Sequence, residues 1–115
     1  MNTELITKIK DAYADYCYAE FAEETSITYL EKLTTLDLMY TEIGGHEQYQ
    51  VQLSYDLVAE KIILTFCGIN KNVYYDKECP LQEFYDLIST TSYQDFYSLA
   101  HDIVEEQLGI ENIEW

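Results

Sequence analysis

The sequence predicts an α+β domain in which helices pack on one face of an antiparallel sheet, and three observations support this class. Apolar residues recur with helical spacing near the N-terminus and after Pro80, whereas from Thr35 to Cys67 they mostly alternate or form short runs, as in strands. The 115 residues suffice for one hydrophobic core and not for two. Apolar residues make up 48% of the chain, more than a disordered acidic segment carries. We expect residues 1–115 to form a single domain.

The first expected helix covers residues 3–24. Its apolar side chains recur mostly three and four residues apart, the pattern of a helix with one buried stripe. Asp11 and Asp15 are four residues apart and share another face. Residues 25–33 keep part of this spacing, but their threonines and tyrosine lower helix propensity, so a loop or a short helical turn is expected there.

The middle of the chain predicts an antiparallel meander of three or four strands. After Gly44-Gly45, the residues from Tyr49 to Tyr55 alternate with glutamines and a serine, which predicts a hairpin with one buried and one polar face. A third run covers residues 62–67, and residues 73–75 are a candidate fourth strand. In the first strand the expected alternation sets Leu36, Leu38 and Tyr40 against Asp37 and Met39.

Two helices are expected after the sheet. Pro80 is a typical first helical residue and is followed by apolar residues at helical spacing. Ser92, with Asp95 three residues later, resembles a capping box that opens the last helix, and Gly109 is a natural stop for it. Together with the first helix, they would cover one face of the sheet and leave the other face in solvent.

The charge balance is the most unusual property of the sequence. There are 22 acidic residues against six lysines and no arginine, which gives a formal net charge of −16. No basic residue follows Lys77, and the segment after it carries nine carboxylates. Such a field repels phosphate, so we expect neither direct nucleic-acid binding nor binding to an anionic membrane. A basic protein partner is the expectation.

The motifs of common catalytic, cofactor and metal sites are missing from the sequence. It has no glycine-rich phosphate loop, no HExxH zinc motif and no EF-hand spacing, so no cofactor or metal is expected. His46 or His101 could pair with a cysteine as base and nucleophile. The cysteines, however, lie in apolar segments or just before Pro80, where packing or a loop explains them. We expect a protein that is not an enzyme.

The cysteines and the N-terminus also bear on location. Cys17, Cys67 and Cys79 are odd in number and far apart, which gives no disulfide framework and fits a reducing compartment. The N-terminal residues lack the apolar core of a signal peptide, and no apolar run reaches the length of a membrane span. A cytoplasmic protein is expected.

Tyrosine, present in twelve copies, is the second unusual feature. Tyrosine offers apolar area, a polar tip and a face for cations, so tyrosine mixed with carboxylates suits a surface that binds Lys and Arg. A set of five is better explained as core: Tyr13, Tyr16, Tyr49, Tyr55 and Tyr85. The better candidates for exposed contacts are Tyr18, Tyr74, Tyr93 and Tyr97. Exposed tyrosines would equally suit a homodimer interface.

These features predict a partner-binding surface made of acids and tyrosines. Carboxylates spaced three and four residues apart on helices stand about 5–6 Å apart and would compete with DNA phosphates for a basic channel. Two alternatives remain open: an immunity or antitoxin-like protein that neutralises a basic toxin, and an accessory protein whose acidity serves solubility. The candidate partner-binding residues are Asp11, Asp15, Tyr18, Tyr74, Asp76, Glu83, Asp86, Tyr93, Asp95, Tyr97, Asp102, Glu105 and Glu106.

The short, acidic, tyrosine-rich chain resembles small proteins of phages and conjugative elements, including anti-restriction and anti-CRISPR proteins that mimic DNA. The stretch CPLQEFYDLISTTSYQDFYSLAHDIVEEQLGI, residues 79–110, also resembles an accessory domain associated with large polyvalent proteins of such elements. The resemblance implies an inhibitor of a nucleic-acid-binding host defence protein. It assigns no role to an individual residue.

Overall fold

The computed structural model describes residues 3–20, 33–42, 50–67 and 72–107. Their element order is α1 (Thr3–Glu20), β1 (Thr35–Glu42), β2 (Gln50–Asp56), β3 (Lys61–Cys67), β4 (Asn72–Glu78), α3 (Leu81–Thr90) and α4 (Tyr93–Gln107). The predicted α+β class, with one helix, a meander and two helices, is confirmed. Several sequence expectations lie outside the described residues: the helix end at 21–24, the segment 25–32, Gly44-Gly45, His46, Tyr49 and Gly109.

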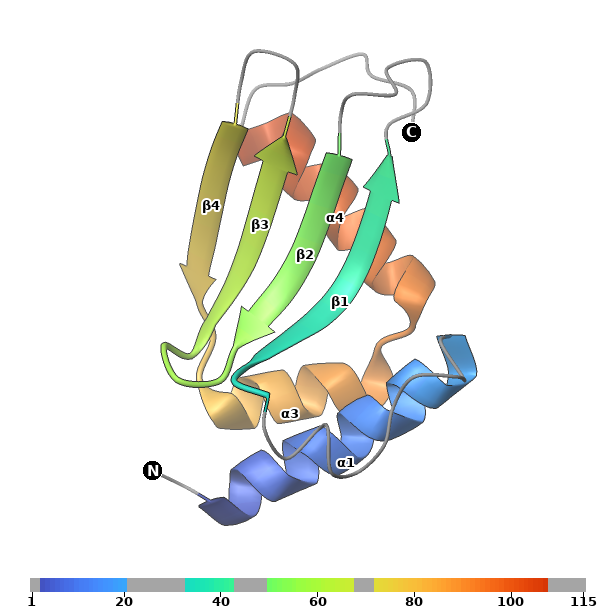
Figure 1. Cartoon of the computed structure of the whole chain (residues 1–115), viewed down its shortest axis with the longest axis vertical. Helices are drawn as coiled ribbons and strands as arrows, with labels where there is room; N and C mark the ends of the chain where they lie inside the picture. The colour runs from blue at the N-terminus through green and yellow to red at the C-terminus, as the bar shows by residue number, and fades with distance from the viewer. Residues whose placement is uncertain (1–2, 21–32, 43–49, 68–71, 108–115) are drawn as a thin grey trace.

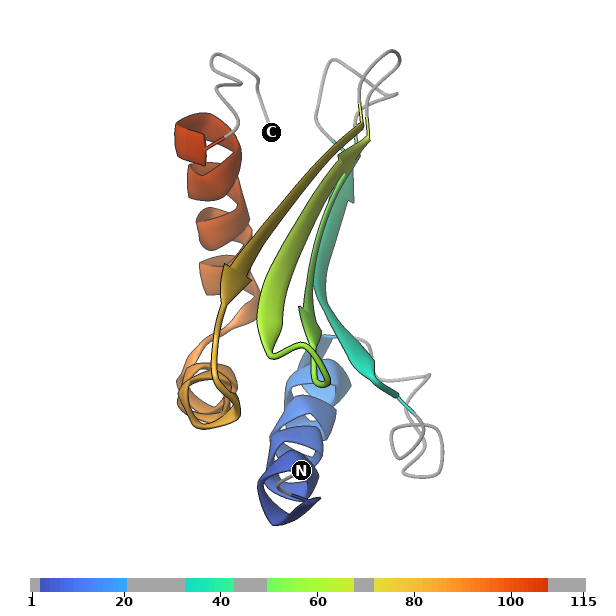
Figure 2. The same cartoon turned by 90° about the vertical axis from the view of Figure 1, so that its left-hand side faces the viewer.

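The four strands form one antiparallel sheet in the order β1-β2-β3-β4, so the candidate fourth strand is present. Leu53 lies opposite Leu64, and Leu64 lies opposite Tyr75, which places these side chains on one face of the sheet. This inner face faces α4, whereas no described helix lies over the outer face (Figure 2). Among the described residues, helices therefore cover the inner face alone, as the glutamine-rich alternation of β2 predicts, although Ser54 on the outer face is also buried.

A β-bulge in β1 corrects the expected alternation of that strand. The register with β2 shifts between Asp37 and Met39, so that Leu38 and Met39 are both buried. Tyr40, expected on the same face as Leu36, lies on the outer face instead and is 49% exposed. A bulge adds one residue to its strand and reverses the faces of all residues that follow, which simple alternation does not reveal.

The three helices of the described ranges pack in two places (Figures 1 and 2). Helix α4 lies against β1 and β2, and its Phe96, Ala100 and Val104 are fully buried. Helices α1 and α3 lie side by side near the turn between β2 and β3. Tyrosines on α1 tie it to the sheet, because Tyr13 Oη donates to the carbonyl of Asp37 at 2.8 Å and Tyr16 Oη donates to that of Leu38.

Tyr55 joins the sheet to α3. Its ring stacks on that of Phe84, with centroids 3.7 Å apart and planes 1° from parallel. Its hydroxyl donates a 2.6 Å hydrogen bond to the carbonyl of Cys79, just before the helix. Tyr13, Tyr16 and Tyr55 are core residues, as predicted, and the structure adds that their hydroxyls donate to backbone carbonyls. Tyr85 is half-buried against the same core.

Both C-terminal helices begin within one residue of their predicted starts, and Pro80 is the N-cap of α3 and not its first helical residue. Helix α3 starts at Leu81, directly after Pro80, and its first N–H donates to the Glu60 carboxylate at 3.0 Å. At the start of α4, the Asp95 carboxylate accepts hydrogen bonds from the Ser92 N–H and hydroxyl, each 3.0 Å. These bonds, the backbone one first, lower the pKa of Asp95. The capping box formed by Ser92 and Asp95 is confirmed.

Candidate functional site

An open cleft of about 600 Å³ lies between β4, α3 and α4. Carboxylates from all three elements line it, and we call it the acidic cleft. Its charged residues are Lys77, Glu78, Glu83, Asp86, Asp102 and Glu106. Its other lining residues are Ile62, Tyr75, Cys79, Leu87, Thr90, Leu99 and Ile103. Four of the carboxylates, on Glu83, Asp86, Asp102 and Glu106, belong to the predicted partner-binding set.

Helix α3 turns one stripe toward this cleft. Glu83, Asp86, Leu87 and Thr90 all line it, and at about 3.6 residues per turn this spacing keeps them on one face. Another face, which includes the fully buried Phe84, packs into the core and fixes the orientation of the helix about its own axis. The spacing of Glu83 and Asp86 places their Cβ atoms about 5–6 Å apart.

Helix α4 presents the same pattern from the other side. Leu99, Asp102, Ile103 and Glu106 line the cleft and have the same relative positions as the four residues of α3. Phe96, Ala100 and Val104 of this helix are fully buried, and the acidic stripe lies on another face, which lines the cleft beside β4. Two helices therefore each contribute two carboxylates and an apolar side chain next to them to one hollow.

The floor of the cleft is apolar. Ile62 and Ile103 are buried and Leu87, Leu99 and Tyr75 are partly buried, and these residues lie among the carboxylates. Lysine and arginine side chains bury their alkyl stems along such surfaces while the charged head stays near the rim. The tyrosine ring adds a face for a cation. The lining therefore suits an inserted basic side chain.

The charges of the cleft are strongly unbalanced. Five carboxylates face a single lysine, Lys77, among the described residues that line it. Nowhere in the described ranges do three His, Cys, Asp or Glu side chains converge closely enough to hold a metal ion. The five carboxylates of the cleft are spread over β4, α3 and α4.

The cysteine of the cleft is a poor nucleophile. Burial, and after it the charge of Glu83, raise the pKa of Cys79 to about 11. The thiolate is the reactive form of cysteine, so at neutral pH this side chain is almost entirely the unreactive thiol. On α4, His101 contacts carboxylates instead, with Nε2 3.3 Å from Glu105 and Nδ1 4.0 Å from Asp102.

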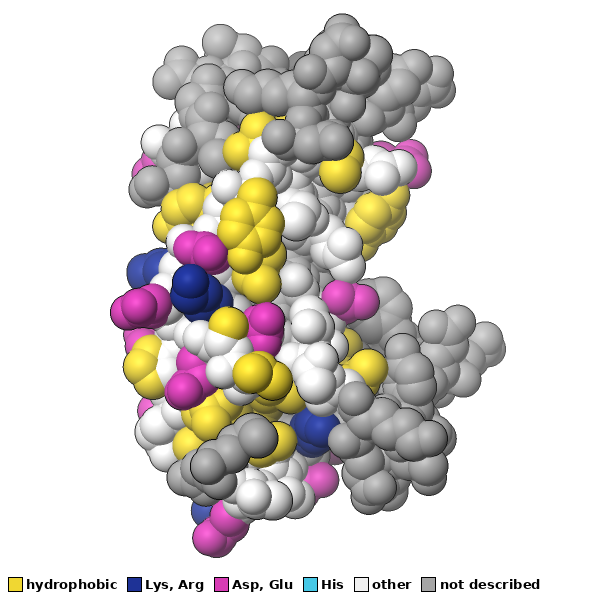
Figure 3. Space-filling view, turned by 60° about the vertical axis from the view of Figure 1, so that its left-hand side comes forward, with side chains coloured by type: hydrophobic (Ala, Val, Ile, Leu, Met, Phe, Trp, Pro, Cys, Tyr) yellow, Lys and Arg dark blue, Asp and Glu magenta, His cyan; other side chains and the backbone are white. Residues whose placement is uncertain are grey.

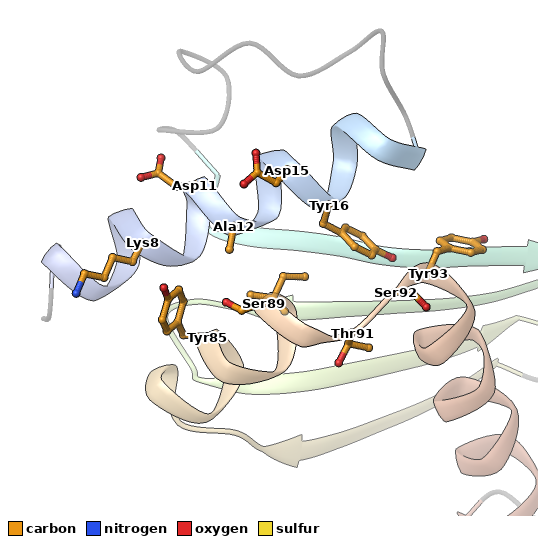
Figure 4. A pocket seen from close by; sticks show the side chains of 11 residues that line it. Lys8, Asp11, Ala12, Asp15, Tyr16, Tyr85, Ser89, Thr91, Ser92 and Tyr93 are labelled. Carbon is orange, nitrogen blue, oxygen red and sulfur yellow. The ribbon is translucent and has the colours of Figure 1, made fainter.

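Three further predicted residues lie at a second cleft, of about 560 Å³, between α1 and α3 (Figure 4). It is lined in part by Asp11, Asp15 and Tyr93, together with Lys8 and Tyr85. In Figure 4 the two aspartates project from α1 away from α3. The α3 residues that line the two clefts lie on opposite faces of that helix. The carboxylates of α1 therefore do not join those of the acidic cleft.

The remaining candidates have separate positions. Tyr74 and Asp76 lie on the outer face, where Tyr74 is 60% exposed and Asp76 is 3.6 Å from the ammonium of Lys61. Tyr93 and Tyr97, expected to be exposed, are instead half-buried against the core. Asp95 serves the α4 cap and Glu105 contacts His101, as described above. The side chain of Tyr18 lies outside the described part of the chain.

The sequence reasoning missed the contribution of β4 and of the apolar floor. Glu78, Tyr75 and Leu99 were not singled out, although they line the same hollow as the four predicted carboxylates. One signal was available, because residues 83, 86, 87 and 90 repeat the spacing of residues 99, 102, 103 and 106. That repeat predicts two acidic and apolar stripes, but it does not reveal that they face each other.

Comparisons of the chain with protein-family models, curated proteins and solved structures found no match. Among the described residues, no helix combines the length and the apolar character needed to cross a membrane.

Proposed function

We propose that this protein is an acidic inhibitor that binds the basic nucleic-acid-binding surface of a host defence nuclease, as anti-restriction and anti-CRISPR proteins do. One observation carries the proposal: carboxylates from β4, α3 and α4 surround an apolar floor with a single lysine among them. A basic side chain of the partner would insert between α3 and α4, and the carboxylates would occupy positions that DNA phosphates otherwise take.

The charge density of the cleft supports competition with DNA. Within each helical stripe the carboxylates are about 5–6 Å apart, and a DNA strand presents a phosphate about every 3.4 Å along its axis. A Lys- and Arg-lined channel built for phosphates would therefore meet negative charge at a comparable density. The whole-chain charge of −16 adds long-range attraction, which speeds association and makes it sensitive to salt.

The proposal is tested with a panel of restriction endonucleases and RNA-guided nucleases. Each is mixed with fluorescent duplex DNA, and this protein is titrated in at several salt concentrations. We expect displacement of DNA from at least one nuclease, strongest at low salt, because screening weakens contacts between exposed charges. If the protein displaces DNA from none of the nucleases at the lowest salt concentration, the proposal is overturned.

Two matched variants locate the activity. In the cleft variant, Glu83→Gln, Asp86→Asn, Asp102→Asn and Glu106→Gln remove four charges. In the control variant, Glu4→Gln, Asp11→Asn, Asp15→Asn and Glu42→Gln remove four exposed charges elsewhere. Exposed ion pairs contribute about 0.5 kcal/mol each, so the cleft variant should lose roughly 30-fold in inhibition. Equal losses in both variants would mean that net charge, and not the cleft, is responsible.

A partner of the immunity type would give a different result. The protein would then bind one basic toxin tightly, and this complex would persist at salt concentrations that abolish nuclease inhibition. Including a basic ribonuclease and a basic deoxyribonuclease in the panel separates this outcome from competition with DNA.

A further inference from the structure

Strand β4 (Asn72–Glu78) is an edge of the sheet. One side of it pairs with β3, and no other described strand pairs with its second side. Figure 2 looks onto this edge, and no described helix or strand lies in front of it. The exposed residues of β4 include Tyr74, Asp76 and Lys77. The strand therefore offers a row of backbone N–H and C=O groups to an incoming chain.

The acidic cleft runs beside this edge. Tyr75 and Lys77 point to the inner face of the sheet and line the cleft, whereas Tyr74 and Asp76 point to the outer face. Helix α4 packs on the inner face over β1 and β2, away from the β4 edge, and the acidic cleft lies between β4, α3 and α4. In the space-filling view, acidic side chains on this side lie among lysine and apolar side chains (Figure 3).

We propose that β4 accepts an extended basic segment of the partner as a fifth strand. Side chains alternate between the two faces of a sheet, so every second residue of the added strand would enter the acidic cleft. Lysine or arginine at these positions would meet the carboxylates of α3 and α4. The residues between them would lie beside Tyr74 on the outer face. This inference rests on the proposed function and specifies the form of the bound segment.

Charge complementarity selects this occupant over a second copy of the chain. The edge itself carries Asp76 and Glu78, the cleft beside it carries further carboxylates, and each copy has a net charge of −16. Pairing β4 with its equivalent would bring two acidic surfaces together at short range. A strand with alternating basic residues removes that repulsion and fills the apolar floor with alkyl stems.

Synthetic peptides test the inference without altering the fold of the protein. The first peptide alternates lysine with threonine and valine. The second has the same composition with its lysines grouped at one end. Two further versions of the first peptide carry backbone N-methyl groups, one on the odd residues and one on the even residues. Affinity is measured by fluorescence anisotropy, and amide hydrogen exchange is followed in β4.

An added strand directs alternate N–H groups toward its neighbour, so the effect of N-methylation must depend on which residues carry it. We expect the alternating peptide to bind roughly tenfold more tightly than the grouped peptide. One N-methylated version should lose binding, the other should retain it, and amides of β4 should become protected. Equal binding of both N-methylated versions, or no binding of the alternating peptide, would overturn the inference.

The two proposals fail in different ways. If all the peptides bind equally and lose affinity in the cleft variant, the cleft binds basic chains without strand addition, and only the inference is wrong. If the alternating peptide binds with the expected dependence on methylation but equally to the cleft variant, strand addition occurs and the acidic cleft is not its determinant. That result contradicts both the inference as stated and the role of the cleft in the proposed function.

Discussion

Glu60 is the residue at which a substitution series tests the physical account of the fold most sharply. It lies at the end of the turn between β2 and β3 with a positive φ of 55°, a region in which side chains other than glycine are disfavoured. Its carboxylate accepts the first N–H of α3, from Leu81, at 3.0 Å, and its carbonyl accepts the N–H of Cys79 at 2.9 Å. The backbone cost is thus accompanied by a cap on the helix that forms one wall of the acidic cleft.

Three substitutions separate the two effects. Glu60→Ala removes the cap and keeps the unfavourable φ, so it should lower the free energy of unfolding by about 1 kcal/mol. Glu60→Gly also removes the cap but relieves a backbone cost of about 1 kcal/mol, so it should leave stability nearly unchanged. Glu60→Gln keeps an oxygen acceptor and loses only the charge near the helix N-terminus, which costs about 0.5 kcal/mol.

Urea unfolding followed by circular dichroism gives these differences directly. The decisive comparison is glycine against alanine, because where φ is negative glycine is the less stable of the two by about 0.4–1 kcal/mol. At Glu60 the order should reverse, with glycine about 1 kcal/mol more stable than alanine. An alanine variant that equals or exceeds the glycine variant in stability would refute the assigned conformation.

Three further predictions concern single groups. Tyr55→Phe should lower the unfolding free energy by about 1–2 kcal/mol, because it removes the hydroxyl that donates to the Cys79 carbonyl. Tyr40→Phe, at an exposed ring, should change it by no more than about 0.5 kcal/mol. Equal costs would contradict the buried hydrogen bond. The pKa of Asp95 is lowered in the folded protein, so its contribution to stability is present above the ordinary Asp range and is lost as pH falls through the folded pKa. The difference in unfolding free energy between the protein and Asp95→Asn should therefore disappear in acid. A difference independent of pH would exclude the charged cap. In iodoacetamide labelling followed by mass spectrometry, the exposed Cys67 should react well before the buried Cys79, and equal rates would show that Cys79 is accessible.

Local patterns in the sequence were enough to predict the elements of the fold. The alternation from Val51 to Tyr55 reports a strand with one buried face, and the structure places both residues in the core. Ser92 and Asp95 indicate a helix start, and the two reciprocal hydrogen bonds of the capping box form as expected. These features depend on neighbours within a few residues, which is why the sequence reveals them.

Features that depend on distant contacts were not predictable in the same way. The bulge near Leu38 depends on how β1 meets β2, and no residue type in that strand demands it. The acidic cleft depends on how α3, α4 and β4 come together, and the sequence shows only that Asp86 and Asp102 each lie on an acidic stripe. Asp11 and Asp15 follow the same spacing rule, yet their helix packs on the other side of α3.

The location of bound basic chain tests the central claim most directly. The protein is labelled with ¹⁵N and titrated with the alternating lysine peptide, and amide chemical shifts are followed by NMR spectroscopy. The acidic cleft predicts that the changes concentrate in β4 and in the stripes that contain Glu83, Asp86, Asp102 and Glu106. Changes that gather around Asp11 and Asp15, or that follow exposed carboxylates evenly over the whole surface, would contradict the assignment of the acidic cleft as the binding site.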